Sequence, residues 1–201
     1  MRPLPLFDTP EPRKTLPLIR TELGECRRCK LCTTRNRIVF GQGDPKARLM
    51  FIGEAPGEKE DETGFAFVGK AGNLLTELLL ELRITRSTIY IANCVKCRPP
   101  ENRQPEEDEV LACRPFLEMQ ILSIKPKVVV AFGKYAAQWL LGEIPSITKV
   151  RGRVWHSRYG VVIPTYHPAH ILRNPQEAGK FRRDLSMAVQ LANRGAEIDG
   201  R

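Results

Sequence analysis

Short apolar runs alternate with longer amphipathic segments along this chain, and this alternation constrains the fold more than any other feature. Four runs have the length and continuous hydrophobicity of buried strands: 47–53, 88–95, 127–133 and 160–168. Segments with helical spacing of apolar residues follow them: 73–83, 105–125, 134–142 and 175–194. A helix at 15–25 and a short strand at 151–157 complete the predicted elements. We therefore predict an α/β sandwich with a central, mainly parallel four-stranded sheet.

One edge of this sheet is the predicted functional site. Ligands of parallel α/β sheets bind where the strands reach their carboxyl ends. Three segments leave those ends, 53–57, 93–98 and 167–173, and each carries polar residues that a plain turn does not need. We expect the three segments to converge on one site.

The first of these segments opens an unusual loop, "GEAPGEKEDETGFAFVGKAG", at 53–72. It gathers five carboxylates: Glu54, Glu58, Glu60, Asp61 and Glu62. Glycines let a backbone approach a small ligand closely, because they carry no side chain to obstruct it. A flexible acidic surface loop is the alternative interpretation.

The charge of the chain favours an anionic partner. Thirty-two Lys and Arg against 23 Asp and Glu give a net charge of +9, and nucleic acid is the first candidate.

No apolar run approaches the roughly 18 residues of a membrane span, and prolines interrupt the N-terminal stretch where a signal peptide needs continuous hydrophobicity. We expect a cytoplasmic monomer with a flexible arm over 1–15, a single domain over 16–194 and a tail over 195–201.

The six cysteines indicate a metal site rather than disulfides, because the expected compartment keeps thiols reduced. Cys26, Cys29, Cys97 and Cys113 supply four thiolates, which suit zinc or an iron–sulfur cluster. The wide spacing of the last two is unlike a zinc knuckle and favours a cluster. Cys32 is a rival ligand, and a further cysteine at 94 lies within a predicted strand.

Three long motifs carry a specific resemblance. The stretches "GEAPGEKEDETGFAFVGKAGNLL", "NCVKCRPPENRQP" and "HPAHILRNP", together with the four cysteines, resemble the iron–sulfur uracil-DNA glycosylases of family 4. The likeness runs from about residue 26 to residue 194. It implies a three-layer α/β/α sandwich and hydrolysis of the N-glycosidic bond of deoxyuridine in DNA, the first step of base excision repair.

The resemblance also implies residue roles. The uracil-binding set would be Glu54, Ala55, Pro56, Phe67, Asn93 and His167. Phe67 would stack on the flipped base, Asn93 would read the base edge with its amide, and His167 would sit beside uracil O2. The catalytic set would be His167, Glu54 and Asn93. The ligands of a structural [4Fe-4S] cluster would be Cys26, Cys29, Cys97 and Cys113, with Cys32 and Cys94 outside it.

A base inside a duplex must be rotated out before an enzyme can reach it, so the expected partner is single- or double-stranded DNA that contains uracil. Cationic candidates for phosphate contacts lie in or beside the predicted loops: Lys96, Arg98, Arg103, Lys149, Arg151, Arg153 and Arg173. An apolar wedge must fill the vacated stack. Ile171 is our choice for that wedge, and Leu172 is the rival.

The chain departs from the wider superfamily at two positions. Ala55 stands where better-known uracil glycosylases carry a water-orienting aspartate, and Gly57 stands where they carry a tyrosine that excludes thymine. Water activation therefore stays open between Glu54, Glu60 and Asp61. Glu60 is the candidate for rejecting the 5-methyl group of thymine.

Two other functions stay open from the sequence. A nucleic-acid-binding protein without catalysis would bind uracil-containing DNA but release no uracil, and a redox carrier would need a cluster that cycles reversibly. The sequence "PLPLFDTP" at 3–10 is a candidate motif for binding a replication clamp.

Overall fold

The computed structural model describes residues 14–194 and builds one six-stranded sheet in the order β1-β3-β2-β4-β6-β5. The strands are β1 (Gln42–Gly43), β2 (Leu49–Gly53), β3 (Tyr90–Asn93), β4 (Val128–Phe132), β5 (Trp155–Ser157) and β6 (Gly160–Thr165). The four central strands, β3, β2, β4 and β6, run parallel. The edge strands β1 and β5 are antiparallel to their neighbours.

The mainly parallel sheet is confirmed, but the expected number of four strands was too small. The four parallel strands correspond to the four apolar runs, and the two edge strands add to them. β5 lies inside the short strand predicted at 151–157. β1 has only two residues, which is too short to produce a recognisable alternation of polar and apolar side chains.

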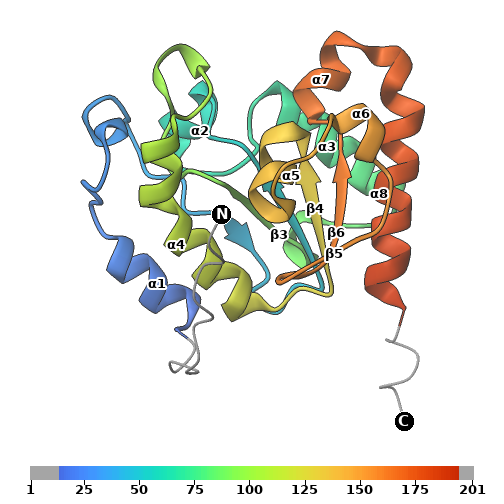
Figure 1. Ribbon diagram of the computed structural model, residues 1–201, viewed down its shortest axis with the longest axis horizontal. Coiled ribbons are helices and arrows are strands. Elements are labelled where there is room, and N and C mark those ends of the chain that lie inside the picture. Colours follow the sequence, from blue (N-terminus) through green and yellow to red (C-terminus); the bar gives the residue numbers. More distant parts are fainter. Residues whose placement is uncertain (1–13, 195–201) are drawn as a thin grey trace.

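Helices cover both faces of the sheet (Figure 1). The α-helices are α1 (Leu16–Leu23), α2 (Glu58–Thr63), α3 (Lys70–Glu81), α4 (Glu107–Ile124), α5 (Gly133–Leu141), α6 (Ile147–Val150), α7 (Pro168–Arg173) and α8 (Ala178–Asn193). Short 3₁₀ turns lie at η1 (Lys30–Thr33), η2 (Arg86–Thr88), η3 (Pro100–Asn102) and η4 (Pro175–Glu177). No helix within the described range 14–194 has both the length and the hydrophobicity to span a bilayer.

Two apolar cores make the fold a three-layer sandwich, as expected. Alternate side chains of the central strands point to opposite faces. On one face, Phe51 and Val130 pack with residues of α3 and α8. On the other, Ile52 and Val129 pack with residues of α4 and α5.

The N-terminal segment joins this sandwich through α1. Ile19 and Leu23 of α1 are buried with Phe40 and with Phe116 of α4. The expected arm over 1–15 and the tail over 195–201 lie almost entirely outside the described residues, as does the candidate clamp motif at 3–10.

Two segments expected as loops contain helices. α2 occupies the middle of the acidic loop, where three carboxylates in its first turn interact favourably with the helix dipole. α7 begins directly after His167 and has Pro168 at its first position, where a missing N–H costs nothing. Both helices have only six residues, so they show too little apolar periodicity to be predicted.

A close contact at Gly72 yields a prediction about stability. A Cβ atom at Gly72 would lie 1.8 Å from the carbonyl oxygen of Phe67. We expect Gly72→Ala to lower the free energy of unfolding by roughly 1–3 kcal/mol, although alanine is the better helix former. Urea unfolding followed by circular dichroism measures the change.

Gly179 in α8 is the matched control. A Cβ atom there would meet only the Arg183 guanidinium at 3.8 Å, so Gly179→Ala should raise stability by roughly 0.5–1 kcal/mol. Equal stability of Gly72→Ala and the unmodified protein would contradict the packing described here.

Candidate active site

A cavity of about 450 Å³ opens at the carboxyl edge of the sheet. All six residues of the expected uracil-binding set line it: Glu54, Ala55, Pro56, Phe67, Asn93 and His167. They come from the ends of β2 and β3, from the loop before α3 and from the start of α7. The three segments predicted to converge therefore do so.

Gly53 makes this convergence possible. It pairs with Asn93 in the parallel register of β2 and β3. A Cβ atom at Gly53 would lie 2.5 Å from the Asn93 Oδ1 atom and 2.6 Å from the Phe67 ring. Since real Cβ atoms do not approach other atoms so closely, only glycine lets these two side chains meet here.

Asn93 lines the cavity and holds an unpaired acceptor. The residue is 1% exposed, and its Oδ1 atom is buried with no hydrogen-bond partner among residues 14–194. The Lys96 ammonium donates to the Asn93 carbonyl oxygen at 2.9 Å and thereby fixes the backbone. A buried orphan acceptor costs about 1–3 kcal/mol, and a donor on a bound ligand would remove that cost.

Phe67 packs against both the sheet residue Phe132 and His167. Its ring centroid is 5.6 Å from that of His167 and 5.6 Å from that of Phe132. The Phe67 backbone has a φ of 54°, a left-handed conformation that costs a bulky residue about 1–2 kcal/mol. The surrounding structure must therefore hold this residue in place.

His167 is held as a neutral donor. It caps α7, and its Nδ1 atom accepts from the Ala169 N–H at 3.1 Å. The proton of a neutral imidazole then resides on Nε2. Burial, reinforced by the nearby Arg173 cation, lowers the pKa of His167 to about 4. The ring is therefore uncharged at neutral pH and has one N–H available.

The three carboxylate candidates for water activation have different environments. Burial raises the pKa of Glu54, which lines the cavity. Glu60 also lines the cavity, but its Oε1 atom accepts from two backbone N–H groups. Asp61 is buried and accepts from the backbone and side chain of Asn36. Asp61 was therefore a wrong candidate, because its carboxylate is fully engaged away from the cavity.

The candidate phosphate contacts divide into two groups. Arg173 lines the cavity and is exposed, and Lys149 on α6 is exposed as well. Arg103 lines the cavity but donates to both carboxylate oxygens of Glu109, while the Arg98 Nε atom donates to Asn102. Arg153 is another candidate, and it is exposed on the segment just before β5.

Lys96 was wrong as a phosphate contact because it is fully buried, and Arg151 is partly buried and paired with a carboxylate. Arg151 forms a paired contact with the buried Asp184 carboxylate and covers the ring of Tyr166. Lys96 is fully buried and donates to Gln120 at 2.7 Å. Their charges are used inside the protein.

The wedge assignment also changes. Ile171 is 3% exposed and belongs to the apolar core beneath α7, so it is buried where a wedge must project. Leu172, the rival, is 45% exposed. The helical geometry of α7, which the sequence did not reveal, turns the two neighbours in different directions.

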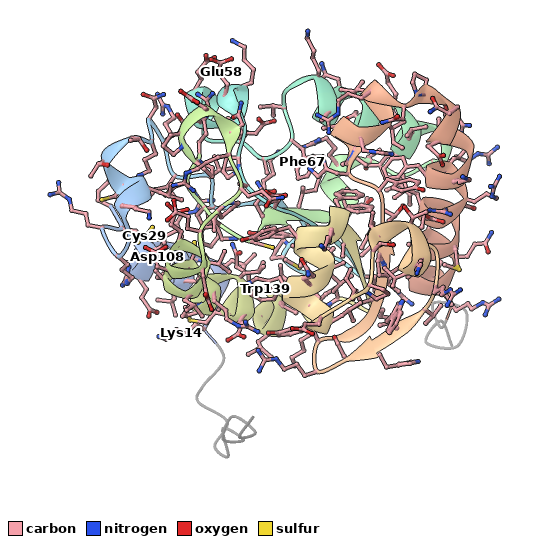
Figure 2. All side chains as sticks on the ribbon, turned by 45° about the horizontal axis from the view of Figure 1, so that its top comes forward. Lys14, Cys29, Glu58, Phe67, Asp108 and Trp139 are labelled. Atoms are coloured by element: carbon pink, nitrogen blue, oxygen red, sulfur yellow. The ribbon has the colours of Figure 1, made fainter. Side chains whose placement is uncertain are left out.

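Three of the four expected ligand cysteines pack together, while Cys26 packs against the neighbouring cluster of α1 and α4. Cys29 and Phe67 lie in different parts of the molecule (Figure 2). Cys97 and Cys113 are buried in one apolar cluster, and Cys29 packs against it. Cys26 accepts from the Arg28 guanidinium at 3.4 Å, and Cys97 accepts from that of Arg35 at 3.4 Å. These donors stabilise negative charge on sulfur.

The other two cysteines lie elsewhere. Cys94 is buried in the core cluster beneath α4 and α5, and Cys32 lines a surface hollow beside η1. Burial raises the pKa of Cys97 to about 12 and that of Cys113 to about 11. Within 14–194, no three His, Cys, Asp or Glu side chains are arranged to hold a metal ion as they stand.

Sequence reasoning missed two residues that shape the cavity. Asn102 lines it from η3 with a left-handed φ of 55°. Arg86 donates to the backbone beside Phe67. Asparagine tolerates the left-handed conformation better than most residues, which is the signal that could have identified Asn102. Nothing in the sequence pattern marks Arg86.

Comparison with known proteins agrees with this geometry. The model of the uracil DNA glycosylase superfamily matches residues 40–190. A type-4 uracil-DNA glycosylase of Sulfurisphaera tokodaii is 44% identical over 187 residues, covering 89% of this chain and 85% of the relative. One of Saccharolobus solfataricus is 49% identical, covering 80% and 78%, and one of Thermotoga maritima is 47% identical, covering 91% and 95%. The chain therefore belongs to the uracil-DNA glycosylase superfamily and, within it, to the type-4 uracil-DNA glycosylases.

Proposed function

We propose that this protein flips uracil out of DNA and hydrolyses its N-glycosidic bond, leaving an abasic site for base excision repair. Asn93 carries the proposal, because it lines a cavity with an aromatic ring and a neutral imidazole and its buried Oδ1 atom has no partner among the described residues. Family membership supports the same activity.

Entry of the base begins at the rim. The exposed Arg173 at the cavity and Lys149 on α6 are suited to bind DNA phosphates. Rotating a base out of a duplex costs a few kcal/mol, and Leu172 is the exposed apolar side chain that can fill the vacated stack. Single-stranded substrates avoid the unpairing part of this cost.

Recognition follows from Phe67 and Asn93. The Phe67 ring offers a face for stacking the flipped base. The Asn93 Oδ1 acceptor matches the N3–H donor of uracil, and the Asn93 amide N–H matches uracil O4. Cytosine presents an acceptor at N3 and a donor at N4, so it is mismatched at both positions.

Bond cleavage uses His167 as an electrophile. As the glycosidic bond breaks, its electron pair moves to the base and negative charge develops at O2. The Nε2–H of neutral His167 donates to that oxygen, and a donor aimed at developing charge contributes roughly 2.7–4 kcal/mol. Because the imidazole is already neutral, it stabilises the leaving anion without first losing a proton.

Water then adds to the anomeric carbon of the sugar. Glu54 is our choice for the base that accepts the proton of this water. It lines the cavity, and burial raises its pKa and makes the carboxylate a better base. Glu60 is less suited because its Oε1 atom already accepts two backbone N–H groups.

The cysteine quartet supports a structural [4Fe-4S] cluster held by Cys26, Cys29, Cys97 and Cys113. Four thiolates, guanidinium donors and an apolar surround match what such a cluster needs. When bound, it would cross-link the N-terminal segment to β3 and α4. No catalytic step depends on it.

The decisive test is release of free uracil with time from an oligonucleotide that carries one deoxyuridine, with thymidine and deoxycytidine oligonucleotides as controls.

In Asn93→Asp the carboxylate repels uracil O4, so we expect single-turnover uracil release to slow by roughly 100-fold. The same carboxylate can accept the N4 hydrogens of cytosine, so cytosine release should become detectable. Binding of the uracil oligonucleotide without any release would overturn the enzymatic proposal, and unchanged kinetics of the variant would remove Asn93 from the site.

His167→Ala should slow single-turnover cleavage by roughly 10²–10³-fold while changing the Kd for DNA less than threefold, because its contact strengthens only as O2 becomes anionic. A loss confined to affinity would make His167 a positioning residue instead.

The depressed pKa of His167 gives a pH prediction for the free protein. Nuclear magnetic resonance titration of the imidazole should show a neutral Nε2–H form that protonates near pH 4 rather than 6.5. Between these values the unfolded chain binds more protons than the folded one. The contribution of His167 to the free energy of unfolding is therefore complete above pH 6.5, and it is lost as the pH falls through 4. A midpoint near 6.5 would contradict this environment.

The cluster proposal predicts about four irons per chain and broad absorbance near ~400 nm in protein purified without oxygen. Cys97→Ala should lower iron content and the Tm, whereas Cys32→Ala should change neither. Colourless protein with one zinc per chain would contradict the cluster.

A further inference from the structure

The backbone of residues 66–69 carries Phe67 and is bound from two sides. Phe67 is the residue in the left-handed region, with a φ of 54°. Directly behind it, the Phe67 carbonyl oxygen lies where a Cβ atom of Gly72 would otherwise sit, at 1.8 Å. The segment is therefore pressed against the start of α3 in a conformation that it would not adopt alone.

Arg86 binds the two carbonyl groups of this segment. From η2, its Nη2 atom donates to the Ala66 carbonyl oxygen at 2.5 Å and its Nη1 atom donates to that of Phe67 at 3.0 Å. A further contact of 3.3 Å joins Nη1 to the Thr76 hydroxyl on α3. The planar guanidinium thus fixes two successive peptide groups at once, which a lysine cannot do.

Glu60 binds the two N–H groups that follow. Its Oε1 atom accepts from the Val68 N–H at 2.7 Å and from the Gly69 N–H at 2.8 Å. Burial lowers the pKa of Arg86, and the Glu60 carboxylate raises it in opposition. The two charged groups therefore act on one short segment and also on each other.

We propose that Arg86 is a positioning residue for base recognition. Together with Glu60, it holds the Phe67 ring in the position needed to stack on a flat pyrimidine. The ring lies 5.6 Å from that of His167 and faces the cavity that Asn93 lines. Arg86 does not line this cavity, so it acts through the backbone segment that carries Phe67. The inference rests on the proposed function for the identity of the base.

The proposal predicts which kinetic parameter changes. Stacking on Phe67 stabilises the flipped base equally before and during bond cleavage, so loosening the ring weakens uniform binding. The substrate concentration at half-maximal single-turnover rate should then rise, while the maximal rate changes less. A purely structural role would lower the folded fraction and leave that concentration unchanged.

The experiment compares Arg86→Ala with Arg83→Ala, since Arg83 is an exposed arginine on the same connection. Arg86→Ala should raise the half-saturating concentration of a single-stranded uracil oligonucleotide roughly tenfold, and millimolar guanidinium should restore it in part. Arg83→Ala should match the unmodified protein. Glu60→Ala should act in the same direction, and the double variant should lose less than the product of the two single effects.

A second readout needs no DNA. The Phe67 ring shifts the resonances of the His167 side-chain protons, so these resonances should move in folded Arg86→Ala and return in part with guanidinium. Unchanged resonances, or an unchanged half-saturating concentration in the folded variant, would overturn the positioning role. If the unmodified protein released no uracil, the proposed function would fail, and the resonance measurement would still decide whether Arg86 holds Phe67.

Discussion

The site depends on one close approach, that of β2 to β3 at their carboxyl ends. Gly53 and Asn93 are paired in the parallel register, and the missing side chain of Gly53 leaves room for the Asn93 amide and the Phe67 ring. Any other residue at 53 would push both groups away from the cavity. The geometry of the proposed base-recognition site is therefore set by the sheet itself, and the loops only complete it.

Burial is the physical cause of the site's acid–base properties. The same desolvation lowers the pKa of the His167 imidazole and raises that of the Glu54 carboxyl, because it disfavours whichever form is charged. The two shifts bring different advantages. His167 stays neutral and donates through Nε2, while Glu54 becomes a stronger base when ionised. Burial thus prepares a donor and an acceptor in the same cavity.

The sequence predicted the parallel strands and the convergence of their carboxyl ends, since long apolar runs and motif residues report these directly. It did not predict what depends on short elements. Burial of Ile171 and exposure of Leu172 follow from the helical geometry of α7, a helix of six residues that is too short to show periodicity. Likewise, the internal use of Lys96 and Arg151 arises from partners 24 and 33 residues away. Pairing at that separation is set by tertiary structure and leaves no local pattern.

Lys96 joins Asn93, which we propose reads the base, to the cysteine site. Its ammonium donates to the Asn93 carbonyl oxygen, and its backbone N–H donates to the Cys113 sulfur at 3.3 Å. Burial lowers the pKa of this lysine to about 8, so the fold sustains an unfavourable charge to make the side-chain contact. One residue on the exit from β3 thus contacts both β3 and α4. In the proposed function, the cysteine quartet would therefore support uracil recognition mechanically, by fixing the segment that carries Asn93. Ala55, which lines the cavity, packs against the same cysteine cluster.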